Sequence, residues 1–224
     1  MIRKSAAVSP LLLAATLLFA GCTPSVVYSP SINLPPEPLK QKQVQMFAGV
    51  VEMPEARPHK VPERTARGVE ATARVGAFDW MTLQAKFWQD ISDNFDVQRY
   101  GVSVSTILAH TRDFAGVRVG AMPTAVFLCD EAEWLGVGGT LPLCAWLPDV
   151  GVLHPYAALG PGIGFYDTRD DKWGWLMIEN YGCAALLLKH FTINAELSLV
   201  QTFNRYDKRN DSFVTWSING GFLF

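Results

Sequence analysis

The sequence contains no run of eighteen apolar residues, which excludes a membrane-spanning helix of ordinary length. It also contains no cluster of lysine and arginine, and its formal net charge is −2, so no nucleic-acid partner is expected. Charged residues make up only 18% of the chain and hydrophobic residues 49%, a balance that is unusual for a soluble domain with a polar surface. The apolar residues of this 224-residue chain must therefore follow short, interrupted patterns.

The final segment, Ser212 to Phe224, shows such a pattern. Every second position, counted back from the C-terminus, is apolar or glycine: Phe224, Phe222, Gly220, Ile218, Trp216 and Val214. The positions between them include the polar residues Asn219, Ser217 and Thr215. Alternation with a period of two predicts a β-strand with one apolar and one polar face.

The same alternation recurs along most of the chain after residue 42. It runs through residues 43–52, 69–77, 80–88, 101–108, 117–127, 154–167, 173–188 and 191–203. The pattern is weakest at 134–144, where Pro142 argues against a central place in a sheet. Counting this segment and the C-terminal one gives ten strands, whereas merging or discarding two weak segments gives eight. We expect ten.

A strand that ends the chain on an aromatic residue resembles the closing strand of bacterial outer-membrane β-barrels. The stretch from Pro155 to Tyr166, which reads PY-x-x-x-G-x-G-x-G-x-Y, is similar to the penultimate-hairpin region of small OmpA/OmpX-like barrels. The resemblance implies an all-β fold, an antiparallel up-and-down transmembrane β-barrel over residues 43–224. It also implies that the barrel-assembly machinery reads the terminal apolar stripe, which here contains Phe224, Phe222 and Trp216.

Alternation alone does not say whether the apolar face points outward, as in membrane barrels, or inward, as in lipocalins. The polar face carries charges of both signs, which can pair across a narrow lumen: Glu70, Arg74, Lys86, Arg118 and Glu196. Long and short connections alternate, as in membrane barrels, and the Gly-x-Trp signature of a lipocalin's first strand is absent. We therefore expect the apolar face outside and a lumen filled by polar side chains.

The two strands on either side of Phe78 predict a specific pair. If the turn is Ala77–Asp79, Glu70 lies directly opposite Lys86, and Arg74 lies opposite Thr82. Shear of the barrel would shift this pairing toward Arg74 or Glu196.

The N-terminal residues resemble a bacterial lipoprotein signal. Arg3 and Lys4 precede an apolar stretch at 6–20, and the segment ends Leu18-Phe19-Ala20-Gly21-Cys22. A short apolar stretch behind two positive charges predicts an export signal. Its end resembles the lipobox, although Phe19 stands where leucine is usual, and the alternative is an ordinary secretory signal with a coincidental cysteine. The resemblance implies that Cys22 is diacylated, and Thr23, in place of Asp, implies sorting to the outer membrane.

These features divide the chain into a signal peptide at 1–21, a lipidated proline-rich tether at 22–42 and a barrel at 43–224. Prolines in the tether favour an extended polyproline conformation, so little fixed structure is expected at 23–42. Both termini of the mature chain are expected on the periplasmic side, with the lipid in the inner leaflet. Cys129 and Cys144 either form a disulfide in an oxidising compartment or remain unpaired thiols in separate strands.

The sequence favours no catalytic, metal or cofactor site. No two histidines have metal-ligand spacing, and no glycine-rich loop precedes a phosphate-binding helix. His190-Phe191-Thr192 resembles the His-x-Ser of lipid A deacylases, but it lies in a predicted periplasmic turn and threonine replaces serine. We expect a non-enzymatic, lipid-anchored outer-membrane barrel with a structural or surface-interaction role. The alternatives are a lipid A or phospholipid-modifying barrel enzyme and a tethered lipocalin-like carrier. The expected partners are outer-membrane lipids and the barrel-assembly and lipoprotein-sorting machineries.

Overall fold

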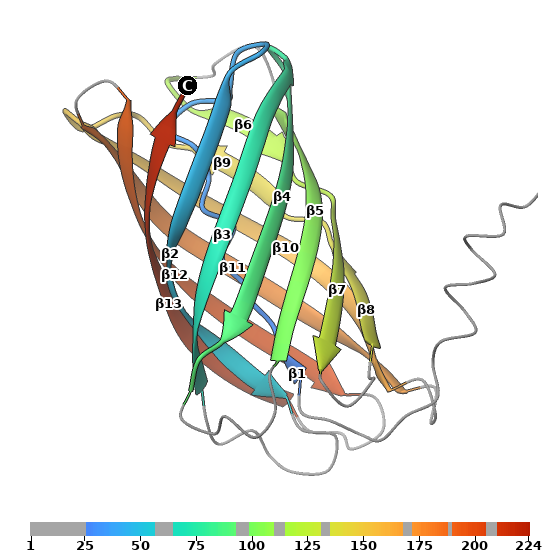
Figure 1. The fold of residues 1–224 in the computed structure, drawn as a ribbon. Coiled ribbons are helices and arrows are strands. Elements are labelled where there is room, and N and C mark those ends of the chain that lie inside the picture. Colours follow the sequence, from blue (N-terminus) through green and yellow to red (C-terminus); the bar gives the residue numbers. More distant parts are fainter. Residues whose placement is uncertain are drawn as a thin grey trace, which may run out of the picture.

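The computed structural model describes residues 26–56, 65–92, 99–109, 115–130, 135–167, 172–187, 190–204 and 210–224. These residues form inclined strands that wrap into a barrel (Figure 1). No helix in these ranges is long and apolar enough to cross a membrane.

The strands follow one another along the chain in a simple up-and-down order. Their bounds are β1 (Val26–Val27), β2 (Val44–Ala56), β3 (Thr65–Phe78), β4 (Met81–Asp90), β5 (Arg99–Ala109), β6 (Arg118–Ala121), β7 (Thr124–Asp130), β8 (Leu135–Thr140), β9 (Leu143–Trp146), β10 (Leu153–Asp167), β11 (Lys172–Leu187), β12 (Phe191–Asn204) and β13 (Asn210–Leu223). Neighbouring wall strands are antiparallel, and β13 pairs with β2, which closes the barrel.

Two wall strands are interrupted by proline. Arg118 lies opposite Trp146 and Thr124 lies opposite Thr140, so β6–β7 and β8–β9 each keep a single register across the break. Pro142, whose place in a sheet was in doubt, sits in one of these breaks, because proline has no N–H to donate to the ladder. With each interrupted strand counted once, the described residues form a closed barrel of ten strands. The expected fold class and strand number are confirmed.

Apolar side chains face outward and polar side chains face inward. Along β3, exposed and buried residues alternate from Thr65 to Gly76, with Val69 and Val75 outside and Glu70 and Arg74 inside. In β13, Val214, Ile218 and Phe222 are exposed, whereas Thr215, Ser217 and Asn219 are buried in the lumen. The lipocalin-like alternative, with its apolar face inside, is therefore wrong.

The register between β3 and β4 differs from the prediction. Glu70 lies opposite Trp88, and Thr72 lies opposite Lys86. The turn is Asp79–Trp80 rather than Ala77–Asp79, and the register shifts between Gly76 and Phe78. A bulge adds one residue to one strand of a pair, so every partner before it moves along the ladder.

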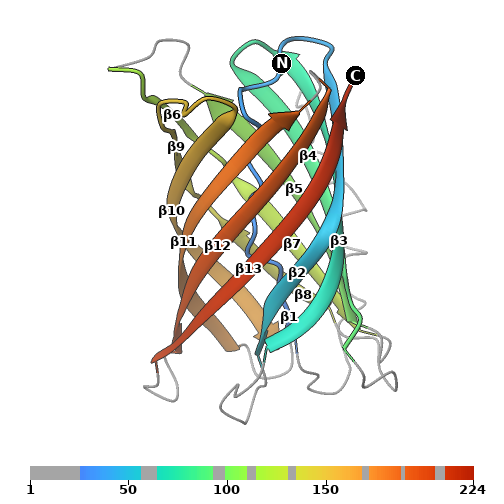
Figure 2. The ribbon, with the colours of Figure 1, turned by 90° about the vertical axis from the view of Figure 1, so that its left-hand side faces the viewer.

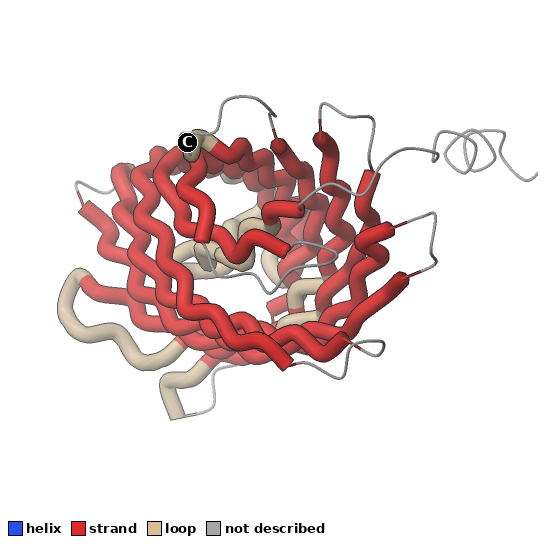
Figure 3. The backbone as a smooth tube through the Cα atoms, turned by 90° about the horizontal axis from the view of Figure 1, so that it is seen from below, coloured by secondary structure: helices blue, strands red, loops and turns tan. Residues whose placement is uncertain are grey.

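The barrel has two distinct ends, and the chain before β2 connects them. At one end, here called the C-terminal end, lie Phe224, the Asp79–Trp80 turn and the start of β2. At the other, called the loop end, lie the strand ends Ala56, Thr65, Asp90 and Arg99, which flank the connections 57–64 and 91–98. Figure 2 shows the chain before β2 running inside the barrel from β1 at the bottom to the start of β2 at the top, and Figure 3, looking along the axis, shows it enclosed by the strands.

The expectation of little fixed structure at 23–42 is therefore wrong for the described part of that segment. All residues from Ser29 to Pro35 are buried. Side chains fill the interior of an eight-stranded barrel, but ten strands enclose a wider space. The wider lumen leaves room for one extended chain, here called the luminal segment, Tyr28–Leu39.

Candidate functional site

The luminal segment has two faces that match two sides of the lumen. Ser29, Ser31 and Asn33 are buried beside polar residues of the wall, whereas Ile32 and Leu34 belong to an apolar cluster. That cluster also contains Ile107, Ala109, Met122, Cys144, Trp146, Tyr156 and Ala158. Alternating side chains of an extended chain point in opposite directions, which places the polar and apolar sets against different strands.

Glu70, on β3, accepts hydrogen bonds on both carboxylate oxygens. Ser29 Oγ and Ser31 Oγ each donate to Oε2 at 2.7 Å. Asn33 Nδ2 donates to Oε1 at 2.6 Å, and Asn219 Nδ2, from β13, donates to the same oxygen at 2.7 Å. Three of these four donors belong to the luminal segment, so the segment supplies most of what replaces water around this carboxylate.

Lys86, on β4, binds the same stretch from the other side. Its Nζ donates to the carbonyl of Ser29 at 3.0 Å and to the carbonyl of Ser31 at 2.5 Å. The same Nζ lies 3.8 Å from Glu70 Oε2 and 5.4 Å from the centre of the Trp88 ring. The ammonium and the carboxylate therefore hold the segment between them as well as attracting each other.

Glu196, on β12, binds the backbone of the luminal segment. The amides of Ile32 and Asn33 donate to Oε1 and Oε2 at 2.9 and 2.8 Å. Tyr156 Oη donates to Oε2 at 2.7 Å, and Asn180 Nδ2 donates to Oε1 at 2.8 Å. Asn33 has a φ of 47°, which asparagine tolerates better than most residues, and successive amides that converge on one anion form a nest-like site.

Arg74, on β3, binds the carbonyl groups at the same bend. Its Nη2 donates to the carbonyl of Ile32 at 3.0 Å and also to the carbonyl of Asn33. Its Nε donates to Gln84 Oε1 at 2.6 Å, and its Nη1 donates to Gln45 Oε1 at 3.3 Å. Glu196 thus accepts from the N–H groups of Ile32 and Asn33, and Arg74 donates to their C=O groups.

Further carbonyls of the segment are satisfied by wall side chains. They are Pro30, which accepts from Asn180 Nδ2 at 3.0 Å, Leu34, from Asn194 Nδ2 at 3.0 Å, and Pro35, from Trp146 Nε1 at 2.9 Å. Proline suits positions 30 and 35 of the buried segment because it has no N–H that would need a partner in the lumen. Glu70, Glu196, Arg74 and Lys86 carry two charges of each sign, so this arrangement is electrically balanced.

The predicted lumen residues are thus not all in one place. Glu70, Arg74, Lys86 and Glu196 surround the luminal segment, whereas Arg118 is half-buried opposite Trp146, near the C-terminal end. Phe224, Phe222 and Trp216 lie on the outer surface, with Phe224 72% exposed. Cys22 lies outside the described residues.

Of the two alternatives for Cys129 and Cys144, the disulfide is wrong, because Cys144 is a free thiol. Cys129 lies opposite Leu135, but Cys144 lies opposite Gly120, near the other end of the same strand pair. At ~3.3 Å per residue, this separation is about 30 Å, whereas bridged cysteines have Cα atoms within about 7 Å.

The sequence interpretation missed Ser29, Ser31 and Asn33, which donate hydrogen bonds to Glu70 inside the lumen. The signal was available, because residues 29–34 read S-P-S-I-N-L, with polar residues at every second position. Their role depends on enclosure by strands that follow much later in the chain, so the pattern alone did not distinguish a lumen-filling chain from a tether.

The described histidines form no reactive cluster. His190 is exposed in the turn before β12, and the Nδ1 atom of His154, at the start of β10, lies 2.8 Å from Asp149 Oδ1. His59 and His110 lie outside the described residues. In the described part of the chain, no group of three or more His, Cys, Asp or Glu side chains is placed to hold a metal ion.

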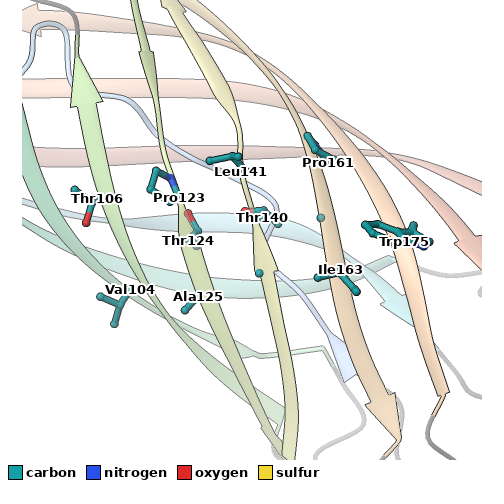
Figure 4. A pocket seen from close by; sticks show the side chains of 12 residues that line it. Val104, Thr106, Pro123, Thr124, Ala125, Thr140, Leu141, Pro161, Ile163 and Trp175 are labelled. Carbon is teal, nitrogen blue, oxygen red and sulfur yellow. The ribbon is translucent and has the colours of Figure 1, made fainter.

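A depression on the outer surface follows the two interrupted strands (Figure 4). Pro123, Leu141 and Pro161 line it, together with Ile163 and Trp175. None of the residues that line it is charged, so it provides neither an acid nor a base for catalysis.

No protein-family model matches the sequence, and no curated protein matches it. Among solved structures, the chain is similar to LpxR from Salmonella typhimurium, with 12% identity and a TM-score of 0.42 over 89% of this chain and 88% of that chain. A bacterial polysaccharide outer membrane secretin gives 12% and 0.43 over 81% and 69%, and the outer membrane protein OprG from Pseudomonas aeruginosa gives 10% and 0.36 over 83% and 97%. At TM-scores below 0.5, these likenesses say nothing about activity or partners.

Proposed function

We propose that this protein is a bacterial outer-membrane β-barrel that closes its lumen with its own N-terminal segment and has a structural or surface-interaction role. The observation that carries the proposal is the luminal segment, which is held by the carboxylates of Glu70 and Glu196 and by the cations of Arg74 and Lys86. A barrel filled in this way is a rigid, closed body rather than an open pore. We assign it no catalytic role.

The outer surface supports the membrane location. A closed barrel leaves no unpaired sheet edge, as a strand structure in lipid requires. Exposed apolar side chains cover the wall, and aromatic residues lie toward both ends, as in the girdles of membrane barrels. Toward the C-terminal end these are Phe78, Trp80, Phe222 and Phe224, and toward the loop end Phe87, Tyr100, Trp175 and Phe203.

The connections support an orientation. Membrane barrels have short periplasmic turns and longer extracellular loops. By the strand bounds, the two shortest connections between wall strands, 79–80 and 188–190, join strands at the C-terminal end, where 110–117 and 147–152 also join strands. The connections 57–64 and 91–98 join strands at the loop end. The C-terminal end therefore faces the periplasm in this proposal, and the loop end faces the cell exterior.

The proposal includes a lipid anchor at Cys22 and the partners that it requires. Outer-membrane lipids would surround the wall, the barrel-assembly machinery would insert it, and the lipoprotein-sorting machinery would deliver the acylated chain. The support is the lipobox-like sequence before Cys22 and the apolar stripe that ends at Phe224.

Planar-bilayer recording of the refolded protein tests the closed lumen. The intact protein should show no steady open state. A variant in which glycine and serine replace residues 28–39 should conduct, because water can then enter the lumen. Heat-modifiable gel mobility checks that both proteins form barrels. A large, steady conductance from the intact, folded protein would overturn the proposal.

A further inference from the structure

The luminal segment runs the whole length of the barrel. At the loop end, Val26 and Val27 of β1 pair with Ala56 and Glu55 at the far end of β2. At the C-terminal end, Lys42 donates its N–H to the carbonyl of Gly76 at 2.8 Å. Because β2 starts beside Phe224, the chain at Val26 and the chain at Phe224 lie at opposite ends of the barrel. This contradicts the expectation that both termini leave on the same side.

The path is fixed along its length as well as at its ends. Near the loop end, Tyr28 packs edge-on against Trp88 with ring centres 6.0 Å apart. The hydrogen bonds to Glu70, Lys86, Glu196 and Arg74 follow in order along residues 29–33, and the Trp146 bond to Pro35 comes next. The wall side chains are thus engaged with one pass of the chain, and a return through the same lumen would displace them.

We infer that the chain before Val26 emerges at the loop end, so that the lipid on Cys22 enters the outer leaflet of the outer membrane, at the cell surface. The inference rests on the proposed lipidation and orientation. Cys22 precedes Val26 by four residues in the sequence, which span at most ~14 Å when fully extended. The apolar band of a membrane barrel is ~25 Å tall. An anchor that starts at the loop end is therefore too short to reach the opposite leaflet around the outside of the barrel.

This arrangement makes the protein a lipoprotein that displays its anchored end outward. The anchor and the extracellular loops would be on the same side of the membrane, and the turns at the C-terminal end would be on the other side.

Single-cysteine labelling on cells tests the inference with minimal change to the segment. The background carries Cys129→Ser, Cys144→Ala and Cys183→Ser and retains Cys22. Three variants of it receive one reporter each: Ser25→Cys before the luminal segment, Glu63→Cys in the 57–64 connection, and Val150→Cys in the exposed turn at the C-terminal end. A membrane-impermeant maleimide is applied to intact and to permeabilised cells.

We expect Ser25→Cys and Glu63→Cys to label equally with and without permeabilisation, whereas Val150→Cys should label at least several-fold more after permeabilisation. If Ser25→Cys behaves like Val150→Cys instead, the threaded path is wrong. If all three labels are reversed, so that only Val150→Cys reacts on intact cells, the path survives and the outer-leaflet location falls with the proposed orientation.

The background protein, in which Cys22 is the only cysteine, tests lipidation separately from the path of the chain through the lumen. Acylated Cys22 has no free thiol, so the denatured background protein should not react with maleimide. Reaction there, together with surface labelling of Ser25→Cys, would overturn the lipid anchor while leaving the path of the chain intact. Gel mobility before and after boiling confirms that each variant forms a barrel.

Discussion

Lys86 Nζ lies 3.8 Å from Glu70 Oε2, although the two residues are diagonal rather than opposite in the β3–β4 ladder. Both side chains are almost fully buried. Ser29 and Ser31 of the luminal segment contact both groups. The pair therefore belongs to a network of wall and segment, and its energetics report on both.

The first prediction concerns this pair. Lys86→Met should destabilise the barrel by ~3–5 kcal/mol, because it leaves a buried carboxylate without its cation. Glu70→Leu combined with Lys86→Met should recover only part of the loss, because the donors from Ser29, Ser31 and Asn33 then lack their acceptor. Urea unfolding in detergent measures both.

The matched control is Lys40→Met, at an exposed lysine, which should change stability by less than ~0.5 kcal/mol. Lys86→Met behaving like this control would mean that the lumen is well hydrated and that the pair is screened.

The second prediction concerns the bend held by Glu196. In Glu196→Gln, one carboxylate oxygen becomes an NH₂ group, which cannot accept from a backbone amide. The loss should be ~1–3 kcal/mol, and the amide protons of Ile32 and Asn33 should exchange faster with solvent. Hydrogen-exchange mass spectrometry measures the second effect directly.

Glu179→Gln serves as the control, since Glu179 contacts Tyr181 near the outer surface rather than the luminal segment. It should leave exchange at residues 32–33 unchanged. Equal exchange in both variants would show that Glu196 does not hold the bend.

The third prediction uses a glycine that touches Tyr156. A Cβ at Gly182 would lie 2.1 Å from Tyr156 Cζ, so Gly182→Ala should push the ring away from Glu196 and Asn194. Overpacking of this kind costs ~1–3 kcal/mol. Gly220→Ala is the control, because its nearest neighbour would be an ordinary 3.4 Å away. Similar thermal midpoints for the two variants would contradict the close packing of Tyr156.

The fourth prediction separates assembly from stability at the C-terminus. Phe224 is 72% exposed and its backbone pairs with Val44, so Phe224→Ala keeps those hydrogen bonds and loses little packing. Its level in the outer membrane of cells should fall, while its unfolding in detergent stays close to normal. Val214→Ala, at an exposed position on β13, the strand that ends next to Phe224, should accumulate normally. Normal levels of Phe224→Ala would remove the proposed role of the terminal aromatic.

The fifth prediction concerns the anchor. Cys22→Ser should abolish incorporation of labelled fatty acid and leave unprocessed precursor. Cys183→Ser, in the barrel wall, should be labelled and processed like the unmodified protein. A mature N-terminus at any residue other than Cys22, found by mass spectrometry, would rule out the lipobox interpretation.

The sequence by itself determined which face of each strand is apolar and which is polar. Along β13, Phe222 and Ser217 had to point in opposite directions, because successive side chains of a strand alternate whatever surrounds them. The same local rule marked ten candidate strands and put Glu70, Arg74, Lys86 and Glu196 on their polar faces. These are properties of neighbouring residues, so no distant contact was needed to infer them.

Only the tertiary structure decided the register and the contents of the lumen. The later turn at Asp79–Trp80 and the register shift before Phe78 together moved the partner of Glu70 by two positions, from Lys86 to Trp88, because a register depends on the geometry of the turn as well as on the pattern. Ser29 meets Glu70 across 41 residues, and Ile32 meets Glu196 across 164 residues. Such contacts exist only after ten strands have closed around a space of the right width, and that width is a property of the whole barrel rather than of any segment.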